Sequence, residues 1–152
     1  MAIRSIVKLG DDVLRKRSKE VTEFDESLST LIDDMFDTMF RADGVGLAAP
    51  QVGILRRVCV VSIDNGITKY ELVNPEIVKT KGVQRGVEGC LSCPGYNGAV
   101  ERPKKLTVKA YDRSGTEHLY KVDGLTAVAF CHEMDHLDGV LFIDKIIKED
   151  KN

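Results

Sequence analysis

Hydrophobic residues recur at helical spacing between residues 25 and 42. One stripe repeats at steps of three and four positions: Leu28, Leu31, Ile32, Met35, Phe36, Met39 and Phe40. This pattern predicts an amphipathic helix whose apolar face covers a core. Asp25 is placed to cap its first turn, and we expect Gly44 and Gly46 to end it. The methionines and aromatics of the stripe are expected to be core residues.

Alternation of apolar and polar residues predicts strands in the middle of the chain. It is clearest from Lys105 to Tyr111, and Leu119 to Val122 is the expected hairpin partner. Three further segments have strand character: Arg57 to Ile63, Lys69 to Val73 and Glu76 to Thr80. Gly82 is expected to break the next run, which continues to Val87. We expect Val140 to Ile143 to be a short extended segment or turn.

A second helix is predicted from about Leu125 to Leu137, and it is apolar on every side through Cys131. A helix that is apolar all round is buried. Strands followed by a helix, with another helix earlier, indicate an α+β fold. We therefore expect antiparallel or mixed β-sheets packed around this central helix, with residues 1–152 forming a single domain.

The second helix ends in the motif His-Glu-x-x-His, formed by His132, Glu133 and His136. Residues four apart on a helix lie on one face, about one turn from each other, so the two imidazoles can share one metal ion. Glu133 can reach a water on that metal and act as its general base. A chance cluster of surface residues is the alternative. The apolar surroundings argue against it, because a buried imidazole without a partner is costly.

Composition narrows the possible function classes. With 22 basic and 24 acidic residues, the net charge of −2 gives no sign of a nucleic-acid site or of membrane binding. No apolar run approaches the length of a membrane span. The first eight residues carry charge too early for a signal peptide, so we expect a cytoplasmic protein. In that compartment its four cysteines are expected to be thiols or ligands, without disulfides.

A catalytic metal site of this kind needs three protein ligands and one open position. The sixteen residues after His136 contain no His or Cys. Their only candidate ligands are carboxylates: Asp138, Asp144, Glu149 and Asp150. The third ligand is therefore expected upstream, with Cys90 the first candidate and Cys93 the second. If both bound the metal together with the two histidines, the site would be closed and structural.

Three stretches together resemble the signature motifs of peptide deformylases, in the same order. They are Gly44–Gln51 (GVGLAAPQ), Glu88–Ser92 (EGCLS) and His132–His136 (HEMDH). The resemblance covers nearly the whole chain. It implies a metal-dependent hydrolase that removes the formyl group from the N-terminal formylmethionine of newly made polypeptides and releases formate.

The resemblance also implies the parts of the site. Cys90, His132 and His136 are the implied metal ligands, and the implied metal is Fe²⁺, with Zn²⁺, Ni²⁺ or Co²⁺ able to substitute. The ligand types alone would have suggested zinc. The implied chemistry is attack of a metal-bound water on the formyl carbon, with Glu133 as the general base and then the acid. Burial is expected to raise the pKa of Glu133.

Further residues receive roles by the same resemblance. The Gln51 side chain and the Leu91 backbone N–H are expected to hold the negative oxygen of the intermediate. Val45, Gly46 and Gly89 are expected to bind substrate. Supporting roles fall to Glu88 and Arg102 behind the metal ligands, and to Val128 and Ala129 at the methionine pocket.

The expected partner is a formylated nascent peptide, met at the ribosome in the bacterial cytoplasm by a monomeric enzyme. Two alternatives remain. In a small zincin-like peptidase, replacing Cys90 would leave the metal in place. In a structural metal module that includes Cys93, replacing Glu133 would change nothing.

Overall fold

A single antiparallel sheet and two α-helices make up the fold in the computed structural model, which describes residues 2–147. The α-helices and strands follow the order α1 (Glu26–Arg41), β1 (Gly46–Ala48), β2 (Val58–Val61), β3 (Tyr70–Glu88), β4 (Gly98–Tyr111), β5 (Glu117–Asp123) and α2 (Gly124–Leu137). Short 3-10 helices lie at Asp12–Arg15, Ala49–Val52 and Phe142–Asp144. The predicted α+β class is confirmed, with one antiparallel sheet in place of several antiparallel or mixed ones.

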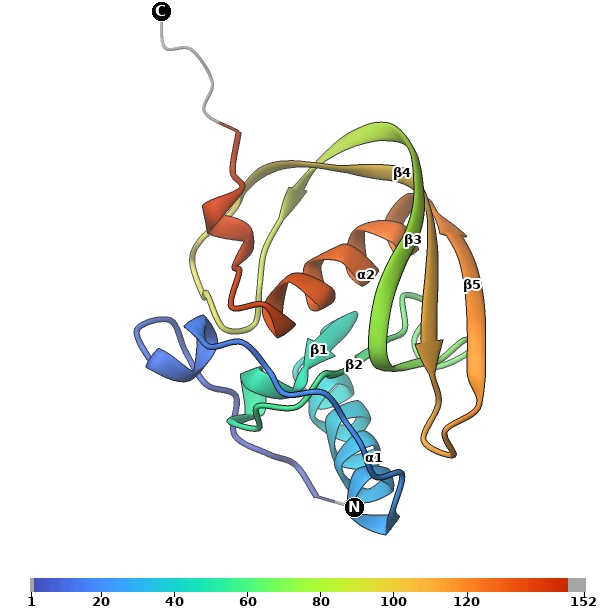
Figure 1. Ribbon diagram of the computed structural model, residues 1–152. Helices are drawn as coiled ribbons and strands as arrows, with labels where there is room; N and C mark the ends of the chain where they lie inside the picture. The colour runs from blue at the N-terminus through green and yellow to red at the C-terminus, as the bar shows by residue number, and fades with distance from the viewer. Residues whose placement is uncertain (1, 148–152) are drawn as a thin grey trace, which may run out of the picture.

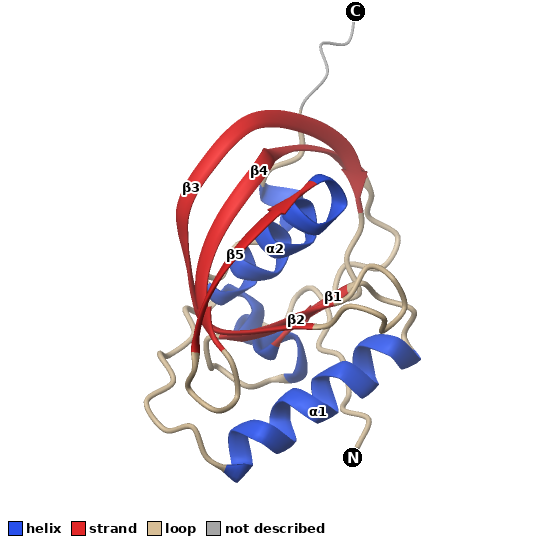
Figure 2. Cartoon of the chain, turned by 90° about the vertical axis from the view of Figure 1, so that its right-hand side faces the viewer, coloured by secondary structure: helices blue, strands red, loops and turns tan. Residues whose placement is uncertain are grey.

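Each strand of the sheet pairs with the next one along the chain, in the order β1-β2-β3-β4-β5. The long strands β3 and β4 curve over α2 like an arch (Figures 1 and 2). The sequence predicted several short strands here, with a break at Gly82, and this was wrong. Gly82 takes a φ of +72°, but pairing continues on both sides of it, at Lys81↔Lys105 and Val83↔Pro103. Glycine tolerates that φ, so β3 continues through the position.

α1 is the helix that the apolar stripe predicted. Asp25 caps it, because its side chain accepts a hydrogen bond from the backbone N–H of Leu28 at 3.0 Å. The helix ends at Arg41, one residue before the predicted end at 42. The left-handed residue after its end is Asp43, with φ of 57°. A short polar side chain is among the few that accept this conformation.

The strands β1 and β2 separate the two helices. Leu47, Val58 and Val60 pack in the same core cluster as the stripe of α1. Ala48 and Cys59 belong to the other cluster, which contains the apolar residues of α2. Successive residues of a strand point to opposite faces, so one small pair of strands supports both helices. Figure 2 shows α1 on one side of β1 and β2 and α2 on the other.

α2 begins directly after β5, and its predicted extent is confirmed. Gly139 follows its end with φ of 75°, and a Cβ at this position would lie 2.4 Å from the carbonyl oxygen of Arg15. The next segment, predicted to be a short extended segment or a turn, forms a 3-10 turn at Phe142–Asp144. Residues 148–152, which include Glu149 and Asp150, lie outside the described residues.

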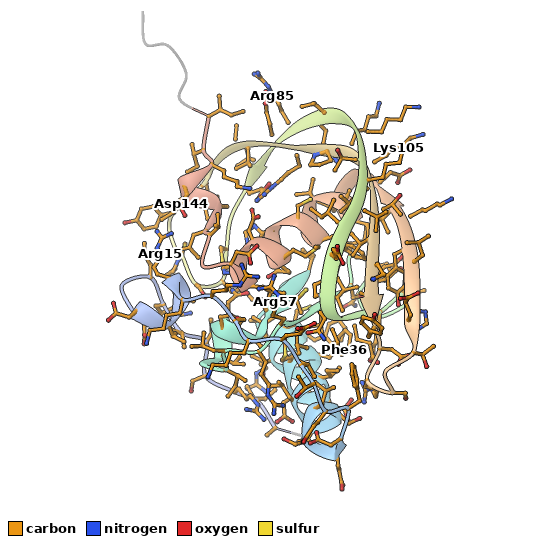
Figure 3. The ribbon with its side chains drawn as sticks, in the orientation of Figure 1. Arg15, Phe36, Arg57, Arg85, Lys105 and Asp144 are labelled. Carbon is orange, nitrogen blue, oxygen red and sulfur yellow. The ribbon has the colours of Figure 1, made fainter. Side chains whose placement is uncertain are left out.

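The outer face of the sheet carries both charged and apolar exposed side chains, among them Leu119 on β5. Leu106, Val108 and Ala110 are buried, as the alternation along β4 predicted. Arg85 and Lys105 project away from α2 on the outside of the arch (Figure 3). Within residues 2–147, neither helix is long and apolar enough to cross a membrane.

Candidate active site

The histidines of α2 and the cysteine that follows β3 meet at the centre of the molecule. Cys90 Sγ lies 3.4 Å from Nε2 of His136. Candidate ligand atoms from Cys90, His132 and His136 all lie within 4.8 Å of one another. Both histidines are buried, whereas Cys90 is half-buried at the wall of a cavity. α2 supplies the two imidazoles from one face, and the end of β3 brings the sulfur to them.

A buried ion pair stands behind His132. The guanidinium of Arg102 donates two hydrogen bonds of 2.9 Å to Glu88, and Glu88 Oε1 lies 2.9 Å from Nδ1 of His132. Burial alone would raise the pKa of Glu88, but the hydrogen bonds from Arg102 and His132 outweigh it and lower the pKa to about 2. An ionised carboxylate only accepts hydrogen bonds, so Nδ1 carries the proton and Nε2 is left for a metal.

The same arginine also binds a second carboxylate, on α2 itself. Arg102 Nη1 also donates to Asp135 Oδ2 at 2.7 Å. Arg102 thereby holds β4 against α2, and Glu88 sets the orientation of the His132 ring. The support expected of Glu88 and Arg102 therefore has a geometric basis.

The other histidine suits a metal for a different reason. Burial, followed by the positive charges of His132 and Arg102, lowers the pKa of His136 to about 3. The imidazole is therefore neutral near neutral pH and keeps a free lone pair. For His132, burial lowers the pKa, but the charge of Glu133 and the bonds to Cys90 and Glu88 together raise it to about 10. A bound cation would act in the opposite direction to those anions.

Glu133 is buried, with its carboxylate in the cavity. Within the described part of the chain its Oε1 atom has no hydrogen-bond partner. Burial raises its pKa to about 7, as the sequence predicted. The approach of β1 is very close, because a Cβ on Gly46 would lie 2.5 Å from Glu133 Oε2. Any larger residue at this position would displace the carboxylate.

Gln51 enters the site from the 3-10 helix Ala49–Val52. Its Oε1 accepts a hydrogen bond from the backbone N–H of Ala48 at 2.9 Å. Its Nε2 therefore points the other way, toward Ser92 Oγ at 3.1 Å and Cys90 Sγ at 3.5 Å. The side-chain amide is thus held with its donor end facing the sulfur of Cys90.

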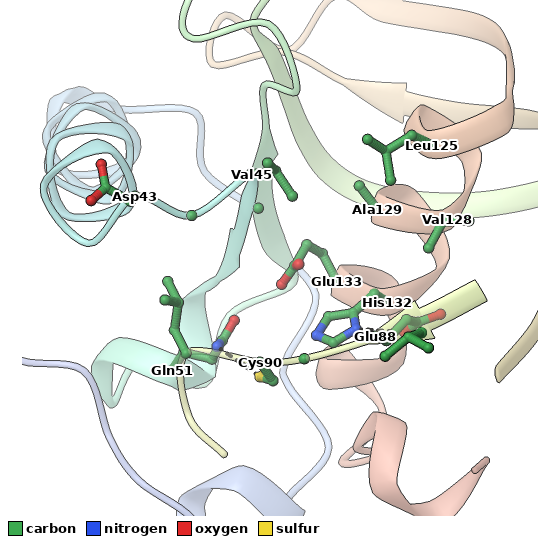
Figure 4. Close-up of a pocket in the computed structure, with 15 residues that line it drawn as sticks. Asp43, Val45, Gln51, Glu88, Cys90, Leu125, Val128, Ala129, His132 and Glu133 are labelled. Atoms are coloured by element: carbon green, nitrogen blue, oxygen red, sulfur yellow. Dashed lines mark hydrogen bonds and ion pairs between the residues drawn. The ribbon is translucent and has the colours of Figure 1, made fainter. Parts of the chain in front are cut away.

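These residues line a cavity of about 390 Å³ (Figure 4). Val45, Gly46, Gly89 and Leu91 line it, as expected, together with residues for which the sequence analysis gave no role: Asp43, Gly44, Val87 and Leu125. Leu125 is an apolar residue that is 57% exposed in the first turn of α2. Val128 and Ala129 continue this apolar wall toward His132.

The donor set fits a transition-metal ion. A thiol and two imidazoles converge, as in metal sites that leave one coordination position open. Glu133, whose Oε1 has no partner among residues 2–147, lines the cavity beside them. A bound water would complete the hydrogen bonding of this oxygen. Cys93 is buried in a separate cluster with Leu14, Val100 and Phe142, so it lies behind Cys90 and not with the imidazoles.

Comparisons with known proteins agree with this geometry. The family described as polypeptide deformylase matches residues 3–152. The chain is 53% identical to peptide deformylase 1 of Clostridium acetobutylicum over 152 residues, which is 100% of both chains. The crystal structure of a peptide deformylase from Legionella pneumophila superposes with a TM-score of 0.93 at 50% identity, covering 96% of this chain and 87% of that one.

A peptide deformylase from Synechococcus elongatus, solved in complex with actinonin, superposes with a TM-score of 0.90 at 42% identity. It covers 95% of this chain and 79% of that chain. Family match, sequence identity and fold thus agree over almost the full length. This chain belongs to the peptide deformylase family.

Proposed function

We propose that Cys90, His132 and His136 hold one divalent metal ion and that Glu133 moves the proton during hydrolysis of the formamide bond. As a family member, the chain is a metal-dependent hydrolase that removes the N-formyl group from nascent peptides. One observation carries the residue assignment. The candidate ligand atoms of Cys90, His132 and His136 lie within 4.8 Å of one another. Cys90 and His132 line the same cavity as Glu133, whose Oε1 has no partner among residues 2–147.

When bound, the ion supplies a Lewis acid that activates water and polarises the formyl carbonyl. We propose Fe²⁺ as the native ion, with Zn²⁺, Ni²⁺ or Co²⁺ able to take its place. One thiolate and two imidazoles are ligands that suit all four. The identity of the ion rests on the family resemblance, and metal analysis of protein purified without oxygen tests it.

Glu133 is the proton carrier in this proposal. Its pKa, raised to about 7 by burial, lies near the value at which a carboxylate both accepts and returns a proton at neutral pH. It takes a proton from the attacking water and passes it to the amine that leaves. The oxygen atom Oε1, which has no partner among residues 2–147, is free to make these contacts.

Two donors are assigned to the negative oxygen that develops on the formyl carbon. They are Nε2 of Gln51 and the backbone N–H of Leu91. Each donor of this type commonly contributes ~3 kcal/mol of transition-state stabilisation. The bond from Ala48 to Gln51 Oε1 fixes the amide in advance, so no reorganisation is needed during the reaction.

The cavity is also the proposed binding site for the formylated peptide. β1 is an edge strand of the sheet, so an extended peptide can pair with the backbone near Val45 and Gly46. Gly89 lines the same cavity. The methionine side chain is proposed to lie against the apolar wall that Leu125 and Val128 form.

We further propose a monomer with a single catalytic domain that meets its substrate at the ribosome in the bacterial cytoplasm. One sheet connects all the strands, which supports a single folding unit. Sedimentation of the protein alone tests whether it is a monomer. Co-sedimentation with ribosomes tests whether it binds them. One cooperative unfolding transition would support the single domain.

The central experiment measures formate release from a formyl-Met-Ala-Ser peptide, with metal content determined on each sample. We expect the parent to release formate and Glu133→Gln to lose kcat/KM by ~10²- to 10⁴-fold while keeping its metal. Glu117→Gln, an exposed glutamate on β5, is the matched control and should match the parent.

A second variant tests the ligands. Cys90→Ser should lose metal as well as activity. If Cys90→Ser binds metal as tightly as the parent, the ligand set is wrong. Full activity in metal-loaded Glu133→Gln would remove that residue from the mechanism.

A further inference from the structure

Cys90 and Cys93 are the two ends of one tight turn that follows β3. The backbone N–H of Cys93 donates to the carbonyl oxygen of Cys90 at 3.0 Å, and Cys90 packs against the buried cluster that contains Cys93. The end residues of such a turn have Cα atoms less than ~7 Å apart. Disulfides span Cα separations of ~4.4–6.8 Å. A bond between the two sulfurs therefore requires little backbone movement.

The two thiols differ in what can reach them. Cys90 lines the cavity, where its sulfur also contacts Gln51 and His136. Cys93 is 1% exposed and packs among Leu14 and Phe142. A small oxidant that enters the cavity meets the sulfur of Cys90 first. Cys93 lies next to it at the other end of the turn. Its thiol is therefore placed to form a disulfide with an oxidised Cys90.

We propose that Cys90 and Cys93 form a reversible redox modification site that closes as a disulfide when a peroxide enters the cavity. Hydrogen peroxide oxidises the Cys90 thiol to a sulfenic acid and releases one water. The sulfur of Cys93 then attacks the sulfur of Cys90, and the sulfenic hydroxyl leaves with the thiol proton as a second water. The two cysteines together lose two electrons and two hydrogens, and the peroxide is reduced to two waters.

The consequence for the metal rests on the proposed function. A disulfide sulfur is no longer a thiolate, so the site keeps only His132 and His136 and is expected to release its ion. The disulfide also stops further oxidation. A sulfenic acid without a resolving thiol proceeds to sulfinic acid, which ordinary thiols do not reverse. Cys93 thus turns a permanent loss of the ligand into a recoverable one.

The remaining cysteines provide internal references. Cys59 on β2 and Cys131 on α2 are both buried in the other core cluster, away from the turn. Neither lines the cavity. We expect both to remain thiols under mild oxidation.

The test uses nickel-loaded protein, so that no iron redox chemistry contributes, treated with a small excess of hydrogen peroxide. The protein is then denatured, alkylated and digested with trypsin. Cys90 and Cys93 fall in one peptide, Gly86 to Lys104, because Arg102 precedes proline. We expect this peptide to be two hydrogens lighter and to resist alkylation until a phosphine reductant is added. Nickel should be released in parallel.

Variants sharpen the result. In Cys93→Ser and Cys93→Ala the same peptide should gain two oxygen atoms, and reductant with fresh nickel should no longer restore activity. Cys59→Ser is the matched buried control and should recover as the parent does.

The parent alone decides the proposal, even if a Cys93 variant folds poorly. Oxygen atoms on Cys90 beside a free Cys93 thiol would overturn it. A disulfide that forms while nickel stays bound would support the redox site and remove Cys90 from the proposed ligand set.

Discussion

The two α-helices bury polar groups with opposite results. α1 buries Asp34 and Thr38, and the N-terminal segment satisfies both. The backbone N–H of Ala2 donates to Asp34 at 2.8 Å, and that of Arg4 donates to Thr38 at 2.9 Å. In α2, buried atoms of Glu133 and His136 have no partner within residues 2–147.

The difference separates a helix that stabilises the fold from one that carries the proposed metal ligands and proton carrier. Buried polar atoms are normally hydrogen-bonded, and exceptions need an explanation. In α1 the buried polar groups Asp34 and Thr38 accept hydrogen bonds from the protein's own backbone, so this helix contributes only to stability. In α2 the open oxygen of Glu133 belongs to a residue that lines the cavity, where water and substrate would complete its hydrogen bonding. Substitutions near α2 should therefore change activity, and those in α1 should change stability.

The largest expected effect on activity, beyond that of Glu133, is at Gln51. Gln51→Met keeps the shape of the side chain and removes the Nε2 donor. We expect kcat to fall by ~10²- to 10³-fold, since the negative oxygen loses one donor. Steady-state formate release on metal-loaded protein measures it. The control is Gln84→Met on β3, whose amide donates to the carbonyl oxygens of Pro103 and Gly124 outside the cavity. Equal losses in both variants would mean that the effect is general.

A core substitution in α1 tests the other side of the comparison. Met35 is fully buried in the stripe, so Met35→Ala leaves a void and should lower the free energy of unfolding by ~2–5 kcal/mol. Denaturant titration measures this loss. kcat of the folded fraction should remain that of the parent. Thr30→Ala, on the exposed face of α1, is the control. A kcat that falls with stability would show that the two helices are coupled.

The ion pair behind His132 should have an intermediate effect, expressed in metal affinity. Glu88→Gln keeps an acceptor for His132 but removes the carboxylate charge. Loss of such a partner of a metal-bound histidine typically weakens metal binding by ~10- to 100-fold. Competition with a chelator reports the affinity. Glu101→Gln is the matched control, since Glu101 makes an exposed ion pair with Arg85 on the same two strands. Unchanged affinity in Glu88→Gln would assign the pair to folding alone.

The smallest expected effect lies at the start of α1. Asp25→Ala removes the side-chain oxygen that accepts from Leu28 N–H. The expected loss is ~1 kcal/mol of unfolding free energy, with kcat and metal content unchanged. Asp25→Asn keeps the acceptor and should recover most of that loss. Thermal and denaturant unfolding of the two variants measure how much the Asp25 cap contributes to the free energy of unfolding.

Much of the fold followed from local periodicity. The stripe of α1, the alternation along β4 and the extent of α2 were all predicted correctly, because each pattern is imposed by the geometry of neighbouring residues. Other features depend on a distant partner. From local sequence alone Gly82 predicts the end of a strand. Pairing with β4 on both sides of it keeps β3 continuous. After α1 the left-handed residue is Asp43, although Gly44 and Gly46 are the nearby residues that most easily adopt that conformation.

The candidate active site likewise has one part that local sequence determines and one part that depends on tertiary packing. Two histidines four residues apart on a helix face one way by backbone geometry alone, so the sequence itself determined that half of the proposed metal site. The choice between Cys90 and Cys93 was open in the sequence, because both sulfurs belong to one turn. The packing of that turn against α2 brought Cys90 to the imidazoles and placed Cys93 in the apolar cluster behind it. Local spacing fixes what a single element presents, whereas only tertiary packing decides which side chains of separate elements meet.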